Sequence, residues 1–138
     1  MKVGIDTNVL VYFLDEDSPF HLECRKNLAC LVESQQAVVA QQNLVELAVI
    51  LTKKGVSNKE TQFIVRGFLN SIPVIKPTLL SFDYFLNLLG RTSKRGVVLF
   101  DLYLAATLMS HRVTSLYTYN EKDFRNIDGI EIWKRIAS

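Results

Sequence analysis

The sequence predicts an α/β fold in which a parallel β-sheet is covered by helices on both faces. Short apolar segments with the length of strands alternate along the chain with longer segments whose apolar residues recur at helical spacing. Residues 37–40 are continuously apolar, which is typical of a strand buried on both sides of a parallel sheet. The first short segment, residues 1–5, leads through Asp6 directly into a helical pattern. Asp6 is therefore expected at the carboxyl end of a strand, the edge where open α/β sheets bind their ligands.

Composition favours a single globular domain that spans residues 1–138. The chain is 49% hydrophobic and 22% charged, and its net charge of +2 neither requires nor excludes a polyanionic partner. Cys24 and Cys30 form no CxxC motif and no Cys/His cluster, so we expect reduced thiols and no zinc site. The sequence contains no signal peptide and no apolar run of membrane length, which predicts a cytoplasmic protein that does not contact a membrane.

Between residue 6 and about residue 55, the sequence predicts three helices and one strand. Residues 9–14 carry apolar residues at helical spacing, and the acidic, proline-containing segment 15–19 interrupts the pattern. A second helix is predicted over residues 20–34, followed by the buried strand at 37–40. A third, strongly apolar helix covers residues 44–51 and ends near two lysines and a glycine.

A capping box begins the next helix. Ser57 stands at the cap position and Glu60 at the third helical position of a helix that runs to about residue 70. Phe63 and Phe68 on this helix are expected to lie in the core. Residues 73–77 are bounded by prolines and suit a short strand near the margin of the sheet.

The second half begins with a helix over residues 78–89, closed by Gly90. Its inner stripe is expected to comprise Leu79, Phe82, Phe85, Leu86 and Leu89. A basic loop covers residues 91–96, and residues 97–100 are either a strand or an apolar approach to the helix at 101–111, because periodicity does not separate the two. The chain ends with a strand at 114–119, a turn at 120–124 and a last, edge strand at 130–133.

Four acids stand near these predicted helix starts, and each one alone can be explained as a helix cap. Asp6 and Asp101 come directly before apolar helical segments. Glu46 and Asp123 each follow an asparagine by three residues, which is the spacing of a capping box.

Taken together, the four acids predict a metal site. Helix starts in a parallel α/β sheet lie at the carboxyl edge of the strands, so the four carboxylates would face one crevice. Their mutual repulsion would raise their pKa values unless a cation neutralised them. Carboxylates without nearby Cys or His select Mg²⁺ or Mn²⁺, and such ions support phosphodiester hydrolysis.

Four segments in this order resemble the PIN-domain family. They are Asp-Thr-Asn-Val-Leu at 6–10, Asn-Leu-Val-Glu-Leu at 43–47, Phe-Asp-Leu-Tyr-Leu-Ala-Ala at 100–106 and Thr-Tyr-Asn-Glu-Lys-Asp-Phe at 118–124. The nearest likeness is to the small single-domain, VapC-like ribonuclease toxins of type II toxin–antitoxin pairs. The resemblance covers essentially the whole chain. Each motif alone is weak, whereas all four in order are specific.

The resemblance implies a three-layer fold with a five-stranded, mainly parallel sheet, and an Mg²⁺- or Mn²⁺-dependent endoribonuclease whose products carry 5′-phosphate and 3′-hydroxyl ends. The first three acids of the family match Asp6, Glu46 and Asp101. Many members carry the fourth acid at the position of Asn120, whereas others have asparagine there and an acid at the position of Asp123. This chain follows the second pattern, so Asp123 is the expected fourth ligand.

Four neighbouring polar residues are expected to support the acids: Thr7, Asn8, Thr118 and Asn120. Thr7 and Asn8 would orient Asp6 or a metal-bound water, as groups behind metal ligands do, although local bonding at the helix start explains them equally well.

The resemblance also implies three partners: an RNA substrate, a cognate antitoxin and a second copy of the chain in a homodimer. Lys94 and Arg95 precede the Asp101 helix and are candidates for contacts with a nucleic-acid backbone, with a solvated surface as the alternative. The alternative function is a catalytically inactive PIN-like module that binds RNA or a protein. The retention of four acids favours the enzyme.

Overall fold

The structure is a computed structural model that describes residues 1–134 of the chain. The strands are β1 Val3–Ile5, β2 Ala37–Ala40, β3 Val74–Ile75, β4 Ser115–Tyr117 and β5 Glu131–Ile132. The helices are α1 Thr7–Leu14, α2 His21–Glu33, α3 Gln41–Lys53, α4 Asn58–Ser71, α5 Leu79–Leu89, α6 Leu99–Ser110 and α7 Glu121–Phe124, and the 3-10 turn η1, Gly96–Val98, leads into α6.

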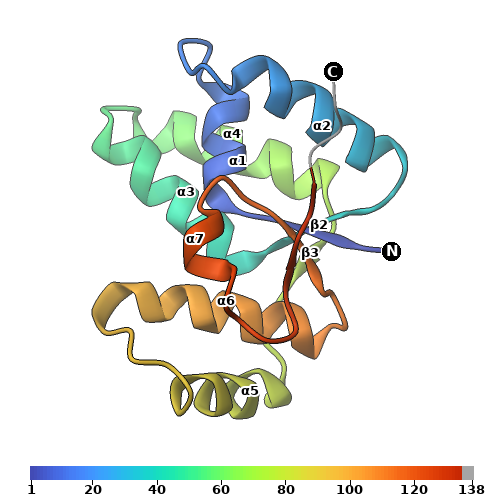
Figure 1. The fold of residues 1–138 in the computed structure, drawn as a ribbon. Helices are drawn as coiled ribbons and strands as arrows, with labels where there is room; N and C mark the ends of the chain where they lie inside the picture. Colours follow the sequence, from blue (N-terminus) through green and yellow to red (C-terminus); the bar gives the residue numbers. More distant parts are fainter. Residues whose placement is uncertain (135–138) are drawn as a thin grey trace.

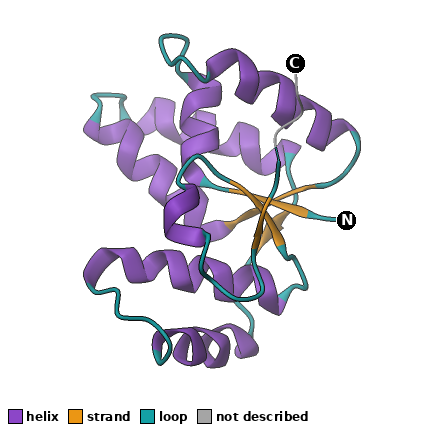
Figure 2. Cartoon of the chain, in the orientation of Figure 1, coloured by secondary structure: helices purple, strands orange, loops and turns teal. Residues whose placement is uncertain are grey.

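All strand pairs are parallel, and the five strands lie in the order β3-β2-β1-β4-β5. Helices α1 to α4 cover one side of the sheet, and α5 and α6 cover the other (Figures 1 and 2). The predicted α/β class, with a five-stranded parallel sheet between helices, is therefore confirmed. The chain adds β2 and β3 on one side of β1 and β4 on the other, so the strand order reverses between β1 and β4. A crevice at the carboxyl ends of these two strands is expected from that reversal.

The sheet separates two apolar clusters because successive side chains of a strand point to opposite faces. Val3 and Ile5 of β1 pack with α1 to α4, whereas Val38 and Ala40 of β2 pack with α6. Between Val3 and Ile5, Gly4 allows the close approach of α6, since a Cβ there would lie 2.7 Å from a methyl group of Leu108.

Most of the predicted elements occur, with ends shifted by a few residues. The predicted turn at 120–124 contains the one-turn helix α7, and residues 97–100 are the approach to α6 and not a strand. The Ser57 hydroxyl accepts a hydrogen bond from the Glu60 amide at 3.1 Å, as predicted for the start of α4. No helix within residues 1–134 has both the length and the apolar character that crossing a bilayer would require.

The predicted inner face of α5 is only partly correct, since Phe85 packs on the core whereas Leu79, Phe82 and Leu86 are exposed. Leu79 is 96% exposed and Phe82 57% exposed, whereas Ser81 and Leu88 are buried. Helix α5 packs mainly against α6 and carries apolar residues around most of its circumference, so spacing alone did not identify the buried side. Phe63 of α4, also expected in the core, is 80% exposed.

Candidate active site

Asp6 lies at the carboxyl end of β1 and begins α1. Its backbone is extended, as at most helix caps, and its Oδ1 accepts a hydrogen bond from the Thr7 amide at 2.8 Å. The side chain is only 7% exposed. A carboxylate buried to this degree must accept hydrogen bonds from the protein, since few waters reach it.

Three side chains from separate segments supply those bonds. The Thr118 hydroxyl, just beyond β4, donates to Oδ2 at 2.7 Å, and the Asn8 amide donates to the same oxygen at 3.3 Å. The Asn43 amide on α3 donates to Oδ1 at 3.3 Å. Burial raises the pKa of Asp6, and these hydrogen bonds, together with the one from Thr7, oppose the rise.

The polar residues around Asp6 also bond to one another. The side-chain Oδ1 of Asn8 accepts a hydrogen bond from the backbone amide of Tyr119 at 3.1 Å, which ties α1 to the segment after β4. The Asn43 amide donates to the Thr7 hydroxyl at 2.9 Å. Asp6 is thus held from both sides of β1, by Thr118 after β4 and by Asn43 on the helix that follows β2.

A cavity of about 630 Å³ lies next to this network, between α3, η1, α6 and α7. Glu46, Asp101 and Asp123 line it from three different helices. Its remaining lining residues are Gln42, Val45, Val97, Val98 and Phe100. Asp6 does not line the cavity, but its charge raises the pKa of both Glu46 and Asp101. The structure therefore brings three predicted acids to one cavity, with the fourth close by.

Gln42 joins the two helices that carry Glu46 and Asp101. Its side-chain amide donates to Glu46 Oε1 at 3.1 Å and to the Phe100 carbonyl at 3.0 Å. The second bond holds the first turn of α6 against α3. These contacts hold together the two helices from which Glu46 and Asp101 line the cavity.

The clustering of negative charge is strongest at Asp101. Burial raises the pKa of this carboxyl, the charges of Asp6, Asp123 and Glu46 raise it further, and Lys94 lowers it, with a result of about 7. Lys94 donates from Nζ to the Asp123 carbonyl oxygen at 2.8 Å. The pKa of Glu46 is also raised, chiefly by burial and further by the charge of Asp6, whereas the hydrogen bond from Gln42 lowers it.

The helix-cap explanation holds for Asp6 alone. Glu46 lies in the second turn of α3, which begins at Gln41, and Asp101 lies inside α6, whose cap position is Val98. The Asp123 carboxylate accepts from the Asn120 side-chain amide at 2.7 Å. Three of the four acids thus have no capping role that explains their place at the cavity.

The donor chemistry of this cavity fits a hard divalent cation, because it offers carboxylate oxygens whose charges repel one another. Within residues 1–134, however, no three Asp, Glu, His or Cys side chains stand close enough together to hold one metal ion. Coordination by several acids would therefore require the side chains around the cavity to move inwards. Glu46, Asp101 and Asp123 are only partly buried, which leaves them room to do so.

Sequence reasoning missed two residues of this site. Asn43 was noted only as a possible capping partner of Glu46, and Gln42 was given no role. Asn43 is 1% exposed and shares a helix face with Leu47, which lies one turn further along α3. An asparagine on an otherwise apolar, buried face requires polar partners, and that pattern was visible in the sequence.

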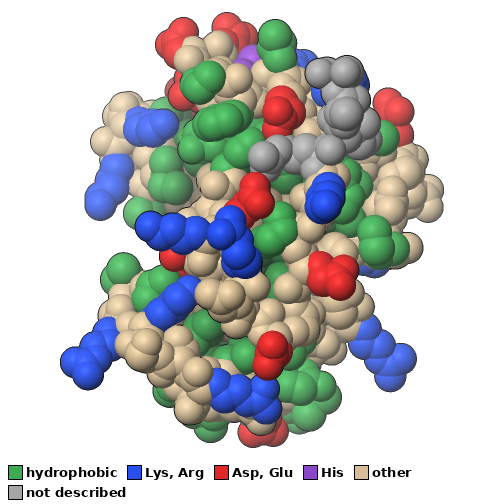
Figure 3. Space-filling model, viewed as in Figure 1, with side chains coloured by type: hydrophobic (Ala, Val, Ile, Leu, Met, Phe, Trp, Pro, Cys, Tyr) green, Lys and Arg blue, Asp and Glu red, His purple; other side chains and the backbone are tan. Residues whose placement is uncertain are grey.

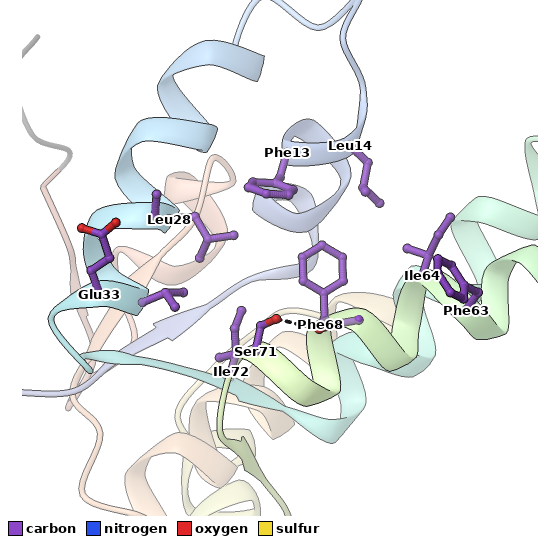
Figure 4. A pocket seen from close by; sticks show the side chains of 12 residues that line it. Phe13, Leu14, Leu28, Glu33, Phe63, Ile64, Phe68, Ser71 and Ile72 are labelled. Atoms are coloured by element: carbon purple, nitrogen blue, oxygen red, sulfur yellow. Dashed lines mark hydrogen bonds between the residues drawn. The ribbon is translucent and has the colours of Figure 1, made fainter.

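A second, apolar hollow of about 450 Å³ lies between α1, α2 and α4 (Figure 4). The rings of Phe13 and Phe68 meet edge to face inside it, with their centroids 5.8 Å apart. Phe63 and Ile64 line it from α4, and Glu33 lines it from α2. It contains none of the four acids.

The raised pKa of Asp101 predicts how stability changes with pH in the absence of divalent ions. Between its ordinary pKa of 3.8 and about 7, the folded state holds more protons at this carboxyl than the unfolded state does. The free energy of unfolding should therefore fall as the pH rises through this range. Asp101→Asn should lose part of this decrease, so that it gains stability relative to the parent protein as the pH rises.

Urea denaturation in the presence of chelator, at a series of pH values from 4 to 8, measures this difference. Asp83→Asn, at an exposed acid of α5, is the matched control and should follow the parent protein. A difference between parent and Asp101→Asn that stays constant with pH contradicts the pKa given to Asp101.

Comparison with known proteins gives the family. The model of the PIN domain matches residues 3–130. Similar solved structures include VapBC2 from Rickettsia felis bound to a DNA fragment from its promoter, with a TM-score of 0.77 and 21% identity over 97% of this chain and 100% of that one. DNA-bound VapBC from Salmonella typhimurium gives a TM-score of 0.75 and 19% identity over 96% and 97% of the two chains.

VapC20 from Mycobacterium tuberculosis, described as a Sarcin-Ricin loop cleaving toxin, gives a TM-score of 0.73 and 11% identity over 94% of this chain and 98% of that one. These identities are low, so the structures establish likeness of fold. A search of curated protein sequences gave no match. Because the PIN-domain model matches nearly the whole chain, this protein belongs to the PIN-domain family.

Proposed function

We propose that the protein is an Mg²⁺- or Mn²⁺-dependent endoribonuclease that acts as the toxin of a type II toxin–antitoxin pair in the cytoplasm. Asp6, Glu46, Asp101 and Asp123 are the proposed metal-binding and catalytic acids. The observation that carries the proposal is the convergence of Glu46, Asp101 and Asp123 on one cavity, with Asp6 close enough for its charge to raise the pKa of Asp101. Repulsion among buried acids lowers the stability of the fold unless a cation neutralises their charge. Acids with strongly raised pKa values are typical of functional sites.

A divalent cation at the cavity would polarise a phosphodiester and lower the pKa of the attacking water. The chain supplies the rest. Glu46, Asp101 and Asp123 would provide oxygen ligands from three helices, and Asp6 would face them from the end of β1. Without a cation, the raised pKa of about 7 leaves the Asp101 carboxyl only partly ionised near neutral pH.

The supporting residues would fix the acids. Thr118 and Asn8 donate to Asp6, and Asn120 donates to Asp123. The Thr7 amide, and not its hydroxyl, bonds Asp6, so this residue would act through the helix start. Such outer partners set the orientation of metal ligands. Lys94 and Arg95 would contact the RNA backbone beside the acids.

RNA as substrate is supported by the likeness to VapC20, whose description names cleavage of the Sarcin-Ricin loop. The alternative is an inactive PIN-like module that binds RNA or a protein. The chain retains all four acids, although the charges of Asp6, Asp123 and Glu46 raise the pKa of Asp101. This retention favours the enzyme over the inactive module.

Cleavage of RNA tests the proposal directly. The purified protein should cut RNA in Mg²⁺ or Mn²⁺ and stop in chelator. Asp6→Asn and Asp101→Asn should each lower the rate roughly 100-fold or more, since each removes a charge that the reacting centre requires. Gel analysis of labelled RNA measures the rate.

Asp83→Asn is the control for loss of one acid and should cleave like the parent protein. Cleavage that survives both Asp6→Asn and Asp101→Asn at the normal rate would overturn the assignment of the acids. A folded parent protein that cuts no RNA under any metal condition would favour the inactive module.

An antitoxin partner is part of the same proposal. The apolar hollow between α1, α2 and α4 offers a helix-sized surface with Phe63 exposed at its rim (Figure 4). The likeness of the fold to a chain of a toxin–antitoxin complex from Klebsiella pneumoniae supports such a partner. A homodimer is proposed as well, and the exposed Leu79, Leu80, Phe82 and Leu86 of α5 supply an apolar surface for it.

The proposal expects a small antitoxin to be encoded beside this protein, and co-purification with that product tests the partner. Phe63→Asp should abolish its co-purification with this chain, because the charge would face the apolar hollow. Val49→Asp, at an exposed apolar residue of α3 outside both the hollow and the α5 surface, is the control and should retain the partner. Equal retention by both variants would place the antitoxin elsewhere.

A further inference from the structure

A further cavity, of about 320 Å³, differs from the acidic cavity and the apolar hollow described above because its lining is largely polar. It lies between the loop that follows α5 and the segment that follows α7. Its polar lining residues are Arg91, Thr92, Ser93 and Lys94 from the loop, and Asn126 and Asp128 from the segment after α7. None of the roles described above uses Arg91, Thr92 or Asn126.

Lys94 connects this cavity to the acidic one. It lines the polar cavity, its Nζ bonds the Asp123 carbonyl oxygen at 2.8 Å, and its charge acts on Asp101. Asp101 and Asp123 line the acidic cavity. The two cavities are therefore neighbours, with Lys94 at their boundary.

The polar cavity holds donors that are only weakly engaged. Arg91 makes one contact with Asp128, at 3.4 Å, and the two side chains are 61% and 84% exposed. An exposed pair with one long contact contributes little, so an incoming anion can replace the carboxylate. The Lys94 ammonium has three protons, and its hydrogen bond to the Asp123 carbonyl oxygen uses one of them. The Thr92 hydroxyl accepts from the Lys94 amide at 3.2 Å and still has its own proton to donate.

This donor set matches a phosphate group. A guanidinium presents several N–H groups in a planar fork that fits phosphate oxygens, and an ammonium adds a point charge. The adjacent acids repel a polyanion, so cations beside them are needed to hold one. On the same face, basic side chains also gather over α7, where Lys122 and Arg125 are exposed (Figure 3).

We propose that this cavity binds a phosphate of the nucleic-acid backbone adjacent to the phosphodiester in the acidic cavity, through Arg91 and Lys94 with help from Thr92. The proposal deepens the ribonuclease function and rests on it for the identity of the strand. The Arg91–Asp128 pair then has a definite role, since the Asp128 carboxylate occupies the place of the phosphate and competes with it.

The competition gives a test with two opposite results. All variants are made in Asp101→Asn, so that bound RNA is not cut, and the affinity for a short fluorescent single-stranded RNA is measured by anisotropy at several salt concentrations. Arg91→Gln should weaken binding about tenfold at low salt and lower the slope of log affinity against log salt by about 0.7 to 1. Asp128→Asn should strengthen binding, because it removes the competing carboxylate.

Arg66→Gln, at an exposed arginine of α4, is the matched control and should bind RNA like the Asp101→Asn protein. A merely structural ion pair would make Arg91→Gln and Asp128→Asn shift affinity in the same direction, which would overturn the proposal. So would unchanged RNA binding in Arg91→Gln. Melting temperatures of each variant verify that the fold is intact.

Inorganic phosphate separates the two possible sources of the anion. Competition by phosphate that disappears in Arg91→Gln supports a cavity that accepts any phosphate group. RNA binding that depends on Arg91 without such competition supports recognition of the backbone alone. Because binding is read without cleavage, these results stand apart from the nuclease assay. The parent protein could cut RNA while Arg91→Gln and Asp128→Asn leave RNA binding unchanged. That result would support the ribonuclease function and overturn the phosphate-binding role of this cavity.

Discussion

The hydrogen bonds that Asp6 accepts are the constraint on which the rest of the structure depends. A carboxylate that is 7% exposed is costly to bury unless its oxygens are satisfied. Donors from α1, α3 and the end of β4 satisfy them, and the shortest is the 2.7 Å bond from Thr118. Meeting this requirement fixes the carboxyl ends of β1 and β4 against α3. The cavity lined by Glu46, Asp101 and Asp123 lies next to this fixed point, where the strand order reverses.

Two cavities of different charge lie beside this point, one acidic and one polar with basic residues. Glu46, Asp101 and Asp123 share a cavity in which each added negative charge raises the cost of the next, as the pKa of Asp101 shows. Lys94 stands at its boundary, and a polar cavity with Arg91 follows. Acids that could hold a cation thus lie beside bases that could hold a phosphate, which suits the metal-dependent hydrolysis proposed above.

The sequence predicted the class of fold and the approximate position of every strand, because buried parallel strands followed by helices leave a clear pattern in this chain. It also predicted, from their positions near helix starts, that the four acids would face one crevice. In the structure Glu46, Asp101 and Asp123 line one cavity and Asp6 lies close by. The sequence did not predict the exposed side of α5, which is apolar nearly all round, or the part played by Asn43. Both depend on which neighbour packs against a helix, and short-range spacing carries no such information. The polar cavity at Arg91 was hidden for the same reason, since its two walls lie more than thirty residues apart in the chain.

Paramagnetic broadening by Mn²⁺ measures most directly whether acids far apart in the chain share one cation. Broadening falls steeply with distance from the ion, so the backbone amide resonances that disappear at low Mn²⁺ concentration locate it. The account predicts joint loss of signals around Asp6, Glu46 and Asp101, and recovery of all three groups in Asp101→Asn. Broadening confined to one of these segments, or unchanged by Asp101→Asn, would contradict a shared cation site.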